Sequence, residues 1–322
     1  MSNQKHKPPP HSGGISDAAR KASSLGISYY LRPMNRSLQQ IIPPPPTHFV
    51  GDGFKVHHFI PDYYLSMERM NPFIMLDYGA PHFFPPTETP RGVDVHPHRG
   101  FETVTIAYQG KVAHHDSAGN SGVIGEGDVQ WMTAASGILH KEYHEKNFSK
   151  QGGLFQMVQL WVNLPAAHKM SPPKYQGIEN KDIPKVALPS NTGVVEVIAG
   201  NFQGKAGAAS TFTEVHVLNA KLSANAKVSF QFSERNNTAA LVIQGSVTVN
   251  NEHLVPTNHF ALFSNDGESF ELSTSEDAIV LILSGEPILE PIAAYGPFVM
   301  NSKAELIQAF EDFEAGKFGQ LD

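Results

Sequence analysis

The sequence predicts an all-β protein built from two antiparallel β-barrels, with one helix at the C-terminal end. From about Gly51 onward, short apolar runs are separated by Gly, Pro, Asn and Asp. This pattern is typical of many short strands joined by turns. Five prolines between residues 165 and 189 interrupt this pattern, and the short apolar runs then continue to the end of the second half. A regular helical pattern occurs only near the end of the chain. Together these observations predict two strand-rich halves and a terminal helix.

The composition excludes several classes of function. The 322 residues carry a formal net charge of −7, which disfavours a nucleic-acid-binding protein that depends on a basic surface. Cysteine is absent, so disulfides, iron–sulfur clusters, thiolate zinc sites and a cysteine nucleophile are excluded. The longest notable apolar run, residues 278–283, is far shorter than the ~20 residues of a membrane span. With no apolar export signal at the start, we expect a cytoplasmic protein that neither enters a membrane nor binds nucleic acid directly.

Residues 1–47 are expected to form a proline-rich N-terminal arm, because its proline runs favour extended polyproline II structure. Within the arm, residues 16–24 are expected to form at most a helical turn or two. The first barrel is expected to span residues 48–165. Its clearest strand candidates are bounded by turn residues and lie at 102–108, 111–115, 129–132 and 155–162.

Residues 166–190 are predicted to be a crossover linker, and residues 191–322 a second barrel that ends in the helix. In this half, strand candidates lie at 194–199, 216–222, 240–243, 246–249 and 278–283. Gln244-Gly245 ends a predicted strand in the same way as Gln109-Gly110 does in the first half. This weak internal repeat favours two barrels of one type.

The terminal helix is predicted from its ends as well as from its apolar face. Ser302 and Glu305 have the spacing of a capping box, in which the serine oxygen accepts a hydrogen bond from a free backbone amide and the glutamate reaches back. Gly316 is suited to end the helix. Between them, apolar residues recur at helical spacing, at Leu306, Phe310 and Phe313. We expect a helix near residues 303–315 that packs on the outside of a barrel.

Histidines gather in one segment, since six of the sixteen lie between positions 96 and 144. His96 and His98 flank Pro97, so on a strand both imidazoles project from one face. Pro97 cannot donate a hydrogen bond to a sheet, and the strand is therefore expected at an edge, an end or a bulge. Glu102 shares the parity of the two histidines if no bulge intervenes. Two imidazoles on one face are natural ligands for a divalent first-row metal.

A second pair of candidate ligands, His140 and Glu142, begins 44 positions after His96. Two antiparallel strands that each direct one pair inward could place three imidazoles and a carboxylate around one ion. Such a site suits Fe(II), Mn(II), Ni(II), Cu(II) or Zn(II). An isolated His-x-His is common and could lie at a surface turn, but the second pair favours the metal interpretation. From the residues alone, Glu102 and Glu142 compete for the carboxylate position.

The other histidines of this segment are expected to support the site. His114 and His115 are adjacent on a predicted strand, so at most one of them points inward. We expect the inward-pointing residue to have a structural role or to lie beside the metal ligands and support them. His144 is expected either beside the ligands or at the surface.

Several motifs closely resemble the signature of the pirin family within the cupin superfamily. The first is HPHRGFETV at residues 96–104, and the others are GDVQWMTA at 127–134, GILH at 137–140, LWVNL at 160–164 and GPFVMN at 296–301. The resemblance runs from about Asn71 to Phe313, most of the chain, and its motifs are specific. Residues 1–50 lie outside it.

The resemblance implies a bicupin, in which two jelly-roll-like antiparallel barrels lie face to face. It implies one iron in the N-terminal barrel, residues 48–165, and a degenerate C-terminal barrel, residues 191–322. Carried over from the family motifs, the metal ligands are His96, His98, His140 and Glu142. The resemblance thus selects Glu142, whereas a generic cupin would use Glu102.

The resemblance also implies a function, an Fe(II)-dependent dioxygenase similar to the quercetin 2,3-dioxygenase activity associated with pirins. One divalent metal per chain would bind a flavonol-like substrate, and Glu142 would take the proton of its hydroxyl. The alternative is a metal-binding regulatory protein that modulates transcription factors or metabolic enzymes through protein contacts. A third interpretation is a barrel that the metal only stabilises. All three need the same ligands.

Overall fold

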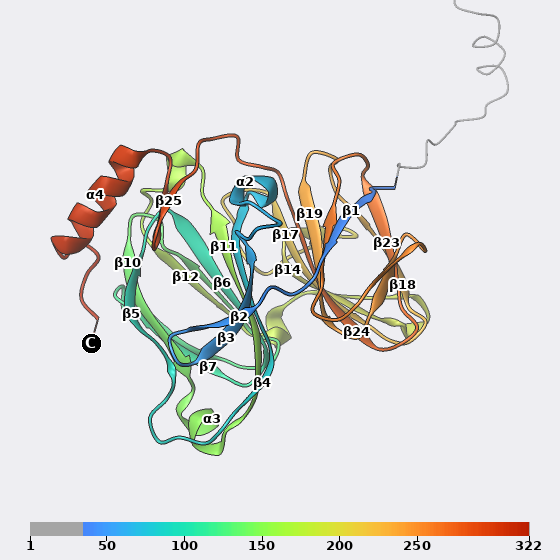
Figure 1. The fold of residues 1–322 in the computed structure, drawn as a ribbon, viewed down its shortest axis with the longest axis horizontal. Coiled ribbons are helices and arrows are strands. Elements are labelled where there is room, and N and C mark those ends of the chain that lie inside the picture. Colours follow the sequence, from blue (N-terminus) through green and yellow to red (C-terminus); the bar gives the residue numbers. More distant parts are fainter. Residues whose placement is uncertain (1–34, 322) are drawn as a thin grey trace, which may run out of the picture. The chain divides into compact units, whose positions relative to one another are not determined.

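A computed structural model describes residues 35–321 of the chain. Most of the predicted arm, including the helical turns expected at 16–24, lies outside these residues. The described residues form two barrels of antiparallel sheets (Figure 1), as the strand texture predicted. The first barrel is drawn mainly in blue and green and the second mainly in yellow and orange.

The first barrel combines a seven-stranded and a four-stranded antiparallel sheet. The larger sheet consists, in spatial order, of β12 (Lys174–Ile178), β9 (Val129–Thr133), β6 (Phe101–Gln109), β11 (Gly153–Asn163), β4 (Phe73–Phe84), β3 (Phe54–Ile60) and β2 (Thr47–Val50). The smaller sheet consists of β5 (Gly92–His98), β10 (Ile138–His144), β7 (Val112–Asp116) and β8 (Ser121–Ile124). The four strands expected in this half are β6, β7, β9 and β11.

The second barrel repeats this arrangement. Its larger sheet consists of β1 (Leu38–Ile42), β22 (Phe260–Phe263), β19 (Asn237–Gln244), β24 (Ala278–Gly285), β17 (Val215–Leu222), β14 (Gly193–Ala199) and β13 (Lys185–Ala187). Its smaller sheet consists of β18 (Lys227–Gln231), β23 (Ser269–Ser273), β20 (Val247–Val249) and β21 (His253–Val255). Two short ribbons pair β15 (Asn201–Phe202) with β16 (Lys205–Ala206), and β25 (Ala293–Tyr295) with β26 (Phe298–Met300).

Helices are few and short among the described residues, and none of them is long and apolar enough to cross a membrane. They are α2 (Met67–Met70), α3 (Lys146–Gln151) and α4 (Lys303–Glu314), with 3-10 turns at Ala166–His168, Asn180–Asp182 and Pro189–Asn191. The predicted cap of α4 at Ser302 is confirmed, since the Ser302 side chain accepts from the backbone N–H of Glu305, but the glutamate reaches back past Ser302 to the preceding residue. The Glu305 carboxylate accepts from the backbone N–H of Asn301 at 3.0 Å. Gly316 follows the helix in the left-handed region, with φ 72°.

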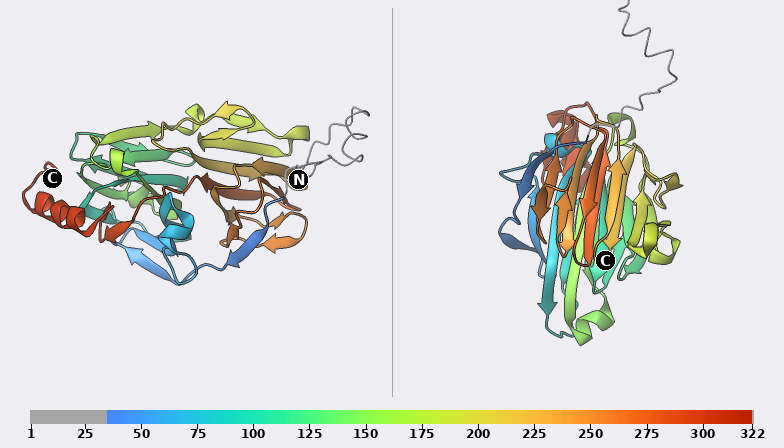
Figure 2. Two further views of the ribbon diagram at one scale, coloured as in Figure 1. Left: turned by 90° about the horizontal axis from the view of Figure 1, so that it is seen from above. Right: turned by 90° about the vertical axis from the view of Figure 1, so that its right-hand side faces the viewer.

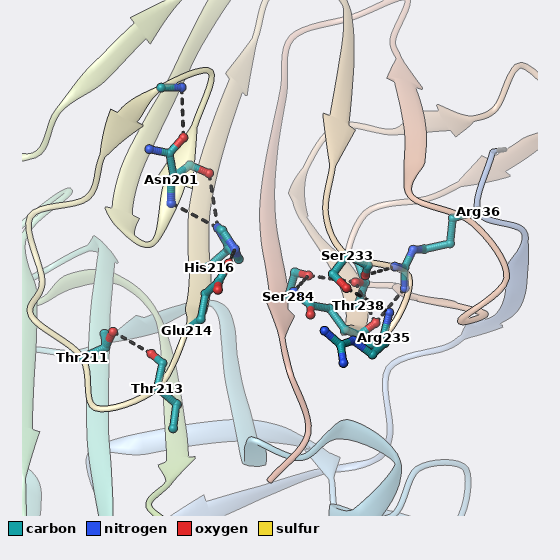
Figure 3. Close-up of polar contacts among 12 residues, drawn as sticks. Arg36, Asn201, Thr211, Thr213, Glu214, His216, Ser233, Arg235, Thr238 and Ser284 are labelled. Atoms are coloured by element: carbon teal, nitrogen blue, oxygen red, sulfur yellow. Dashed lines mark hydrogen bonds and ion pairs between the residues drawn. The ribbon is translucent and has the colours of Figure 1, made fainter. Parts of the chain in front are cut away.

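Two segments expected to be an arm and a linker contribute strands instead. Residues 38–42, within the expected arm, form β1 and pair with β22 of the second barrel. The expected crossover contains β12, which pairs with β9, and β13, which pairs with β14. Arg36 holds the start of β1 in place (Figure 3), since its guanidinium donates to the backbone carbonyls of Asn236 at 2.7 Å and Ser233 at 2.6 Å.

The largest apolar core lies between the two barrels and contains residues from both of their larger sheets. Phe59 of β3 and Phe260 of β22 are fully buried there and stack with ring centroids 5.5 Å apart. A second continuous core fills the space between the two sheets of the second barrel, where Phe230, Phe263 and Phe270 pack together. The buried apolar residues of the first barrel instead form smaller clusters. The first barrel therefore has interior space that the second has filled with aromatic side chains.

The C-terminal helix returns to the first barrel. β24 belongs to the second barrel, but α4 lies beside β10 and β5, on the side of the first barrel away from the second (Figure 1 and Figure 2). Asp312 of α4 accepts a hydrogen bond from Arg99 at 2.8 Å. The Arg99 guanidinium also lies 4.7 Å from the ring centre of Phe318. This end of the chain therefore holds the turn that follows β5.

A candidate metal centre

The first pair of candidate ligands lies on an edge strand, as the proline between them requires. β5 pairs only with β10 within its sheet, and His96 lies directly opposite His140. Further along the pair, Glu142 lies opposite Val93, so the residues from Val93 to His96 face a shorter stretch of β10. This irregularity is a bulge in β5 of the kind that redirects side chains beside functional sites.

Three histidines converge on one point. One ring nitrogen from each of His96, His98 and His140 lies within 4.8 Å of the others, and no other such group of three or more potential ligands occurs among residues 35–321. The ring centroids of His96 and His140 are 4.2 Å apart, and that of His98 lies 4.8 Å from each of them. His140 is fully buried and His98 is 5% exposed. The structure therefore brings three of the four predicted ligands together.

Two of the three imidazoles, those of His98 and His140, favour the neutral form that binds a metal. Burial, and then the neighbouring histidines, hold the pKa values of His98 and His140 well below the ordinary value for histidine. Nδ1 of His96 lies 2.8 Å from the carbonyl oxygen of Asp94, and Nδ1 of His98 lies 3.4 Å from that of Pro297. Hydrogen bonds of this kind hold the proton on Nδ1 and leave the Nε2 lone pair for a metal.

His140 supplies the strongest test of whether a metal fits. Both of its ring nitrogens are buried and neither has a hydrogen-bond partner. A buried polar group without a partner costs about 1–3 kcal/mol. A metal ion that accepts the lone pair of one of these nitrogens would remove part of this cost. The three-imidazole donor set fits a divalent first-row metal.

Glu142 lies on the wall of the same cavity but is not part of the group of mutually close ligand atoms. Its carboxylate is 5% exposed and accepts hydrogen bonds from Thr105 Oγ1 at 3.1 Å and Gln159 Nε2 at 2.8 Å. These two donors hold the carboxylate in a defined position at the edge of the histidine group.

Glu102, the other candidate carboxylate, is directed elsewhere. It lies in β6, after a turn at Gly100 with φ 91°, and so belongs to a different sheet from His96 and His98. Its Oε1 accepts from Thr133 Oγ1 at 2.7 Å, and burial raises its pKa to about 7. It does not line the cavity beside the histidines.

The cavity beside the histidines has a volume of about 300 Å³, at the lower end of the range for small-molecule sites. Its polar and charged lining residues are His96, His98, Glu142, Gln159 and Asp77. The rest is largely apolar and is lined by Val50, Phe54, Val56, Met75, Val93, Met157, Trp161 and Pro297. This combination suits a small, largely apolar molecule that carries polar groups.

Several of these wall residues escaped the sequence analysis. Asp77 lies in β4, a strand that we did not predict, and Pro297 comes from the segment after the second barrel. Gln159 gave a weak signal, because the polar residues of its strand do not keep one parity. The pairing of β11 shifts its register between Gln156 and Met157, and this irregularity explains the broken alternation.

The remaining histidines of the segment are structural. His114 is 1% exposed, and its Nε2 lies 2.6 Å from the hydroxyl of Tyr175, whereas His115 stacks on Tyr143. Only one of the adjacent pair is therefore deeply buried, in line with their alternation. His144 is fully buried, so the surface alternative is wrong, and its Nε2 lies 2.8 Å from the carbonyl oxygen of Gly53.

The second barrel also contains a buried histidine on a strand, but that strand belongs to the larger sheet. His216 of β17 lies 3.1 Å from the backbone N–H of Asn201 through Nδ1, and 3.3 Å from the carboxylate of Glu214 through Nε2 (Figure 3). Both ring nitrogens therefore have protein partners, unlike those of His140. The ring packs against Phe232, part of the apolar filling of this barrel.

Known proteins share both the sequence and the fold of this chain. A protein of Pseudomonas aeruginosa named "Putative quercetin 2,3-dioxygenase" is 49% identical over 271 residues, which cover 84% of this chain and 94% of that protein. A crystal structure of quercetin 2,3-dioxygenase from Acinetobacter baumannii is 46% identical, with a TM-score of 0.85, and the match covers 90% of this chain and all of that one. A bacterial pirin from Escherichia coli, solved in complex with nickel(II), shares the fold at 18% identity and a TM-score of 0.57, over 77% of this chain and all of that one.

The family models divide the chain as the two barrels do. The model described as Pirin matches residues 53–162, and the model described as the Pirin C-terminal cupin domain matches residues 217–319. The first match contains the three converging histidines and the second contains α4. With two barrels of the cupin type, a histidine group suited to a metal and these matches, the chain belongs to the pirin family.

Proposed function

We propose that this protein is a metal-dependent dioxygenase that acts on flavonol-like substrates, with Fe(II) held by His96, His98, His140 and Glu142. The observation that carries the proposal is the buried, unpartnered imidazole of His140, which converges with His96 and His98, two residues of a cavity wall. The names of the Pseudomonas and Acinetobacter relatives support the reaction type.

The shape and chemistry of the cavity support the substrate class. Its apolar side offers Trp161, Met157 and Phe54 to the rings of an aromatic molecule. Its polar lining offers His96, His98 and Glu142 to an enolic hydroxyl and its neighbouring carbonyl. A charged or strongly hydrated substrate would lose its hydration against the apolar side without compensation.

In the proposed mechanism, Glu142 accepts the proton of the substrate hydroxyl. A general base must lie within about 2.6–3.2 Å of the proton donor or act through one water, and a carboxylate beside the histidines meets this requirement for a substrate bound there. Thr105 and Gln159 orient the carboxylate through their hydrogen bonds. The apolar wall excludes water from the ionised substrate. A bound Fe(II) would supply Lewis acidity and electron transfer between the substrate and oxygen.

Oxygen uptake tests the proposal. The protein is loaded with Fe(II) without oxygen, mixed with quercetin and other enolizable phenols, and then exposed to oxygen. We expect uptake above a free-iron control, coupled to loss of the flavonol absorbance. Glu142→Gln, in preparations that retain iron, should bind quercetin but lose turnover. Glu88→Gln, which changes an exposed carboxylate of the same barrel, serves as the matched control.

Two results would contradict the proposal. Quercetin binding without oxygen uptake above the control would exclude the flavonol reaction. Absence of uptake with every phenol would favour the alternative, a metal-binding regulatory protein that acts through protein contacts.

A further inference from the structure

A second ionisable pair lies on the cavity wall, apart from the proposed metal ligands. Asp77 of β4 lines the cavity and is 8% exposed. Its Oδ1 lies 2.6 Å from Nδ1 of His58 in β3. The His58 side chain is 35% exposed, so the pair extends from the cavity wall to solvent. The proposed mechanism uses neither residue.

The strand pairing places Asp77 and His58 in one row with Gln159, another residue of the cavity wall. Asp77 lies opposite His58 on one side and opposite Gln159 on the other. Side chains directly opposite each other in antiparallel strands lie on the same face of the sheet. Gln159 in turn donates to Glu142 at 2.8 Å. Three polar side chains, Gln159, Asp77 and His58, therefore lie side by side across the larger sheet, and Gln159 contacts the proposed ligand from the smaller sheet.

The surroundings of His58 favour its charged form. The hydrogen bond to Asp77 raises the pKa of His58 above its ordinary value, although burial opposes this change. Asp62 also attracts a positive charge on the ring. From β2, the ring of His48 meets that of His58 edge-on, with centroids 6.0 Å apart. An imidazolium beside a carboxylate can release a proton to water while the carboxylate receives one from another group.

We propose that Asp77 and His58 form a proton relay for this cavity, in which Asp77 takes a proton from a hydroxyl of the bound substrate and His58 releases one to solvent. The inference rests on the proposed function for its substrate class, an enolic phenol. In the first step the substrate O–H bond breaks and an O–H bond forms on the free oxygen of Asp77. In the second, the Nε2–H bond of His58 breaks and the proton passes to water. The substrate gains one negative charge and water gains the proton. The net charge of the pair is unchanged, because Asp77 ends protonated and His58 ends neutral.

The relay gives the two carboxylates of the cavity separate tasks. Glu142 lies on the cavity wall with His96 and His98 and would serve the substrate hydroxyl that binds beside them. Asp77 can serve a hydroxyl at another position of the same substrate, or a later proton transfer. Asp77 would touch the substrate directly, and His58 would act through Asp77 as a positioning residue.

Ligand ionisation without oxygen tests the relay separately from turnover. Quercetin is bound anaerobically to the iron-loaded protein between about pH 5 and 8, and its ionised form is followed by absorbance. The variants are Asp77→Asn and His58→Gln, each of which keeps a group able to hydrogen-bond with the partner. His82→Gln, a histidine near the end of β4, is the matched control. Elemental analysis confirms that each preparation carries the same metal content.

We expect both relay variants to bind quercetin, but to need about one pH unit more for ionisation, a roughly tenfold loss of the ionised form at a given pH. The control should match the wild type. Equal ionisation curves for the wild type and both variants would overturn the relay, as would a wild type on which quercetin does not ionise. Oxygen uptake is measured in parallel, so a wild type that ionises quercetin without consuming oxygen supports the relay and contradicts only the proposed reaction.

Discussion

Replacing His140 by leucine should stabilise the metal-free protein and remove its response to metal. The imidazole of His140 is fully buried, and both of its nitrogens lack hydrogen-bond partners. Leucine has a similar volume and carries no polar atom. Removing one buried unpartnered polar group is worth about 1–3 kcal/mol. A hydrophobic side chain of altered shape costs up to about 1.5 kcal/mol in packing. Taking the middle of each range, we therefore expect the free energy of unfolding of the metal-free protein to rise by about 1 kcal/mol.

The same substitution should have the opposite effect once metal is added. A ligand that binds only the folded state stabilises it by about 2.7 kcal/mol at a concentration one hundred times its dissociation constant. The wild type should gain this stability from Fe(II), and His140→Leu should gain little or none. A site that is costly when empty and stabilising when filled is typical of residues selected for function.

Denaturant unfolding with and without metal provides the measurement, and elemental analysis gives the metal content. His253→Leu is the matched control, because His253 is a half-exposed histidine of the second barrel. It should leave both stabilities unchanged. A metal-free His140→Leu protein less stable than the metal-free wild type would refute the reasoning about the unpartnered nitrogens. Full metal content in this variant would refute the assignment of His140 as a ligand.

Two further predictions concern carboxylates. Asp312→Asn should lower the free energy of unfolding at neutral pH by about 1.5–3 kcal/mol, since it removes a charged hydrogen bond to the buried Arg99. Lys317 and Arg99 hold the pKa of Asp312 below its usual range. The stability from this carboxylate is therefore present above about pH 3.9 and is lost as the pH falls through the folded-state pKa. A stability difference between wild type and variant that persists in strong acid would contradict this prediction. Glu142→Gln should reduce metal affinity, whereas Glu102→Gln should retain full metal content by elemental analysis; the reverse result would favour the generic cupin arrangement.

The identity of the main elements and of the histidine group followed from local patterns. Apolar runs bounded by turn residues predicted β6, β9 and β11, and the two-residue spacing of His96 and His98 predicted a shared face. The cap at Ser302 predicted the start of α4. These signals are local, because side-chain direction repeats every two residues in a strand and a helix cap depends on neighbours within one turn. The choice of Glu142 over Glu102, by contrast, came from family resemblance and not from spacing.

Tertiary structure decided what depends on distant partners. Ile42 of the expected arm joins a sheet with Phe260, more than two hundred positions away, and no local pattern specifies such a pairing. Contacts between distant segments also produce three features of the site. They are the bulge in β5, the hydrogen bond between Asp77 and His58, and the position of Pro297 on the cavity wall. Burial without a partner, the property that distinguishes His140, is likewise a result of packing. The sequence alone determined which side chains share a face, because that depends on chain geometry within one strand. Which faces meet, and what each buried group lacks, depends on contacts that only the folded chain makes.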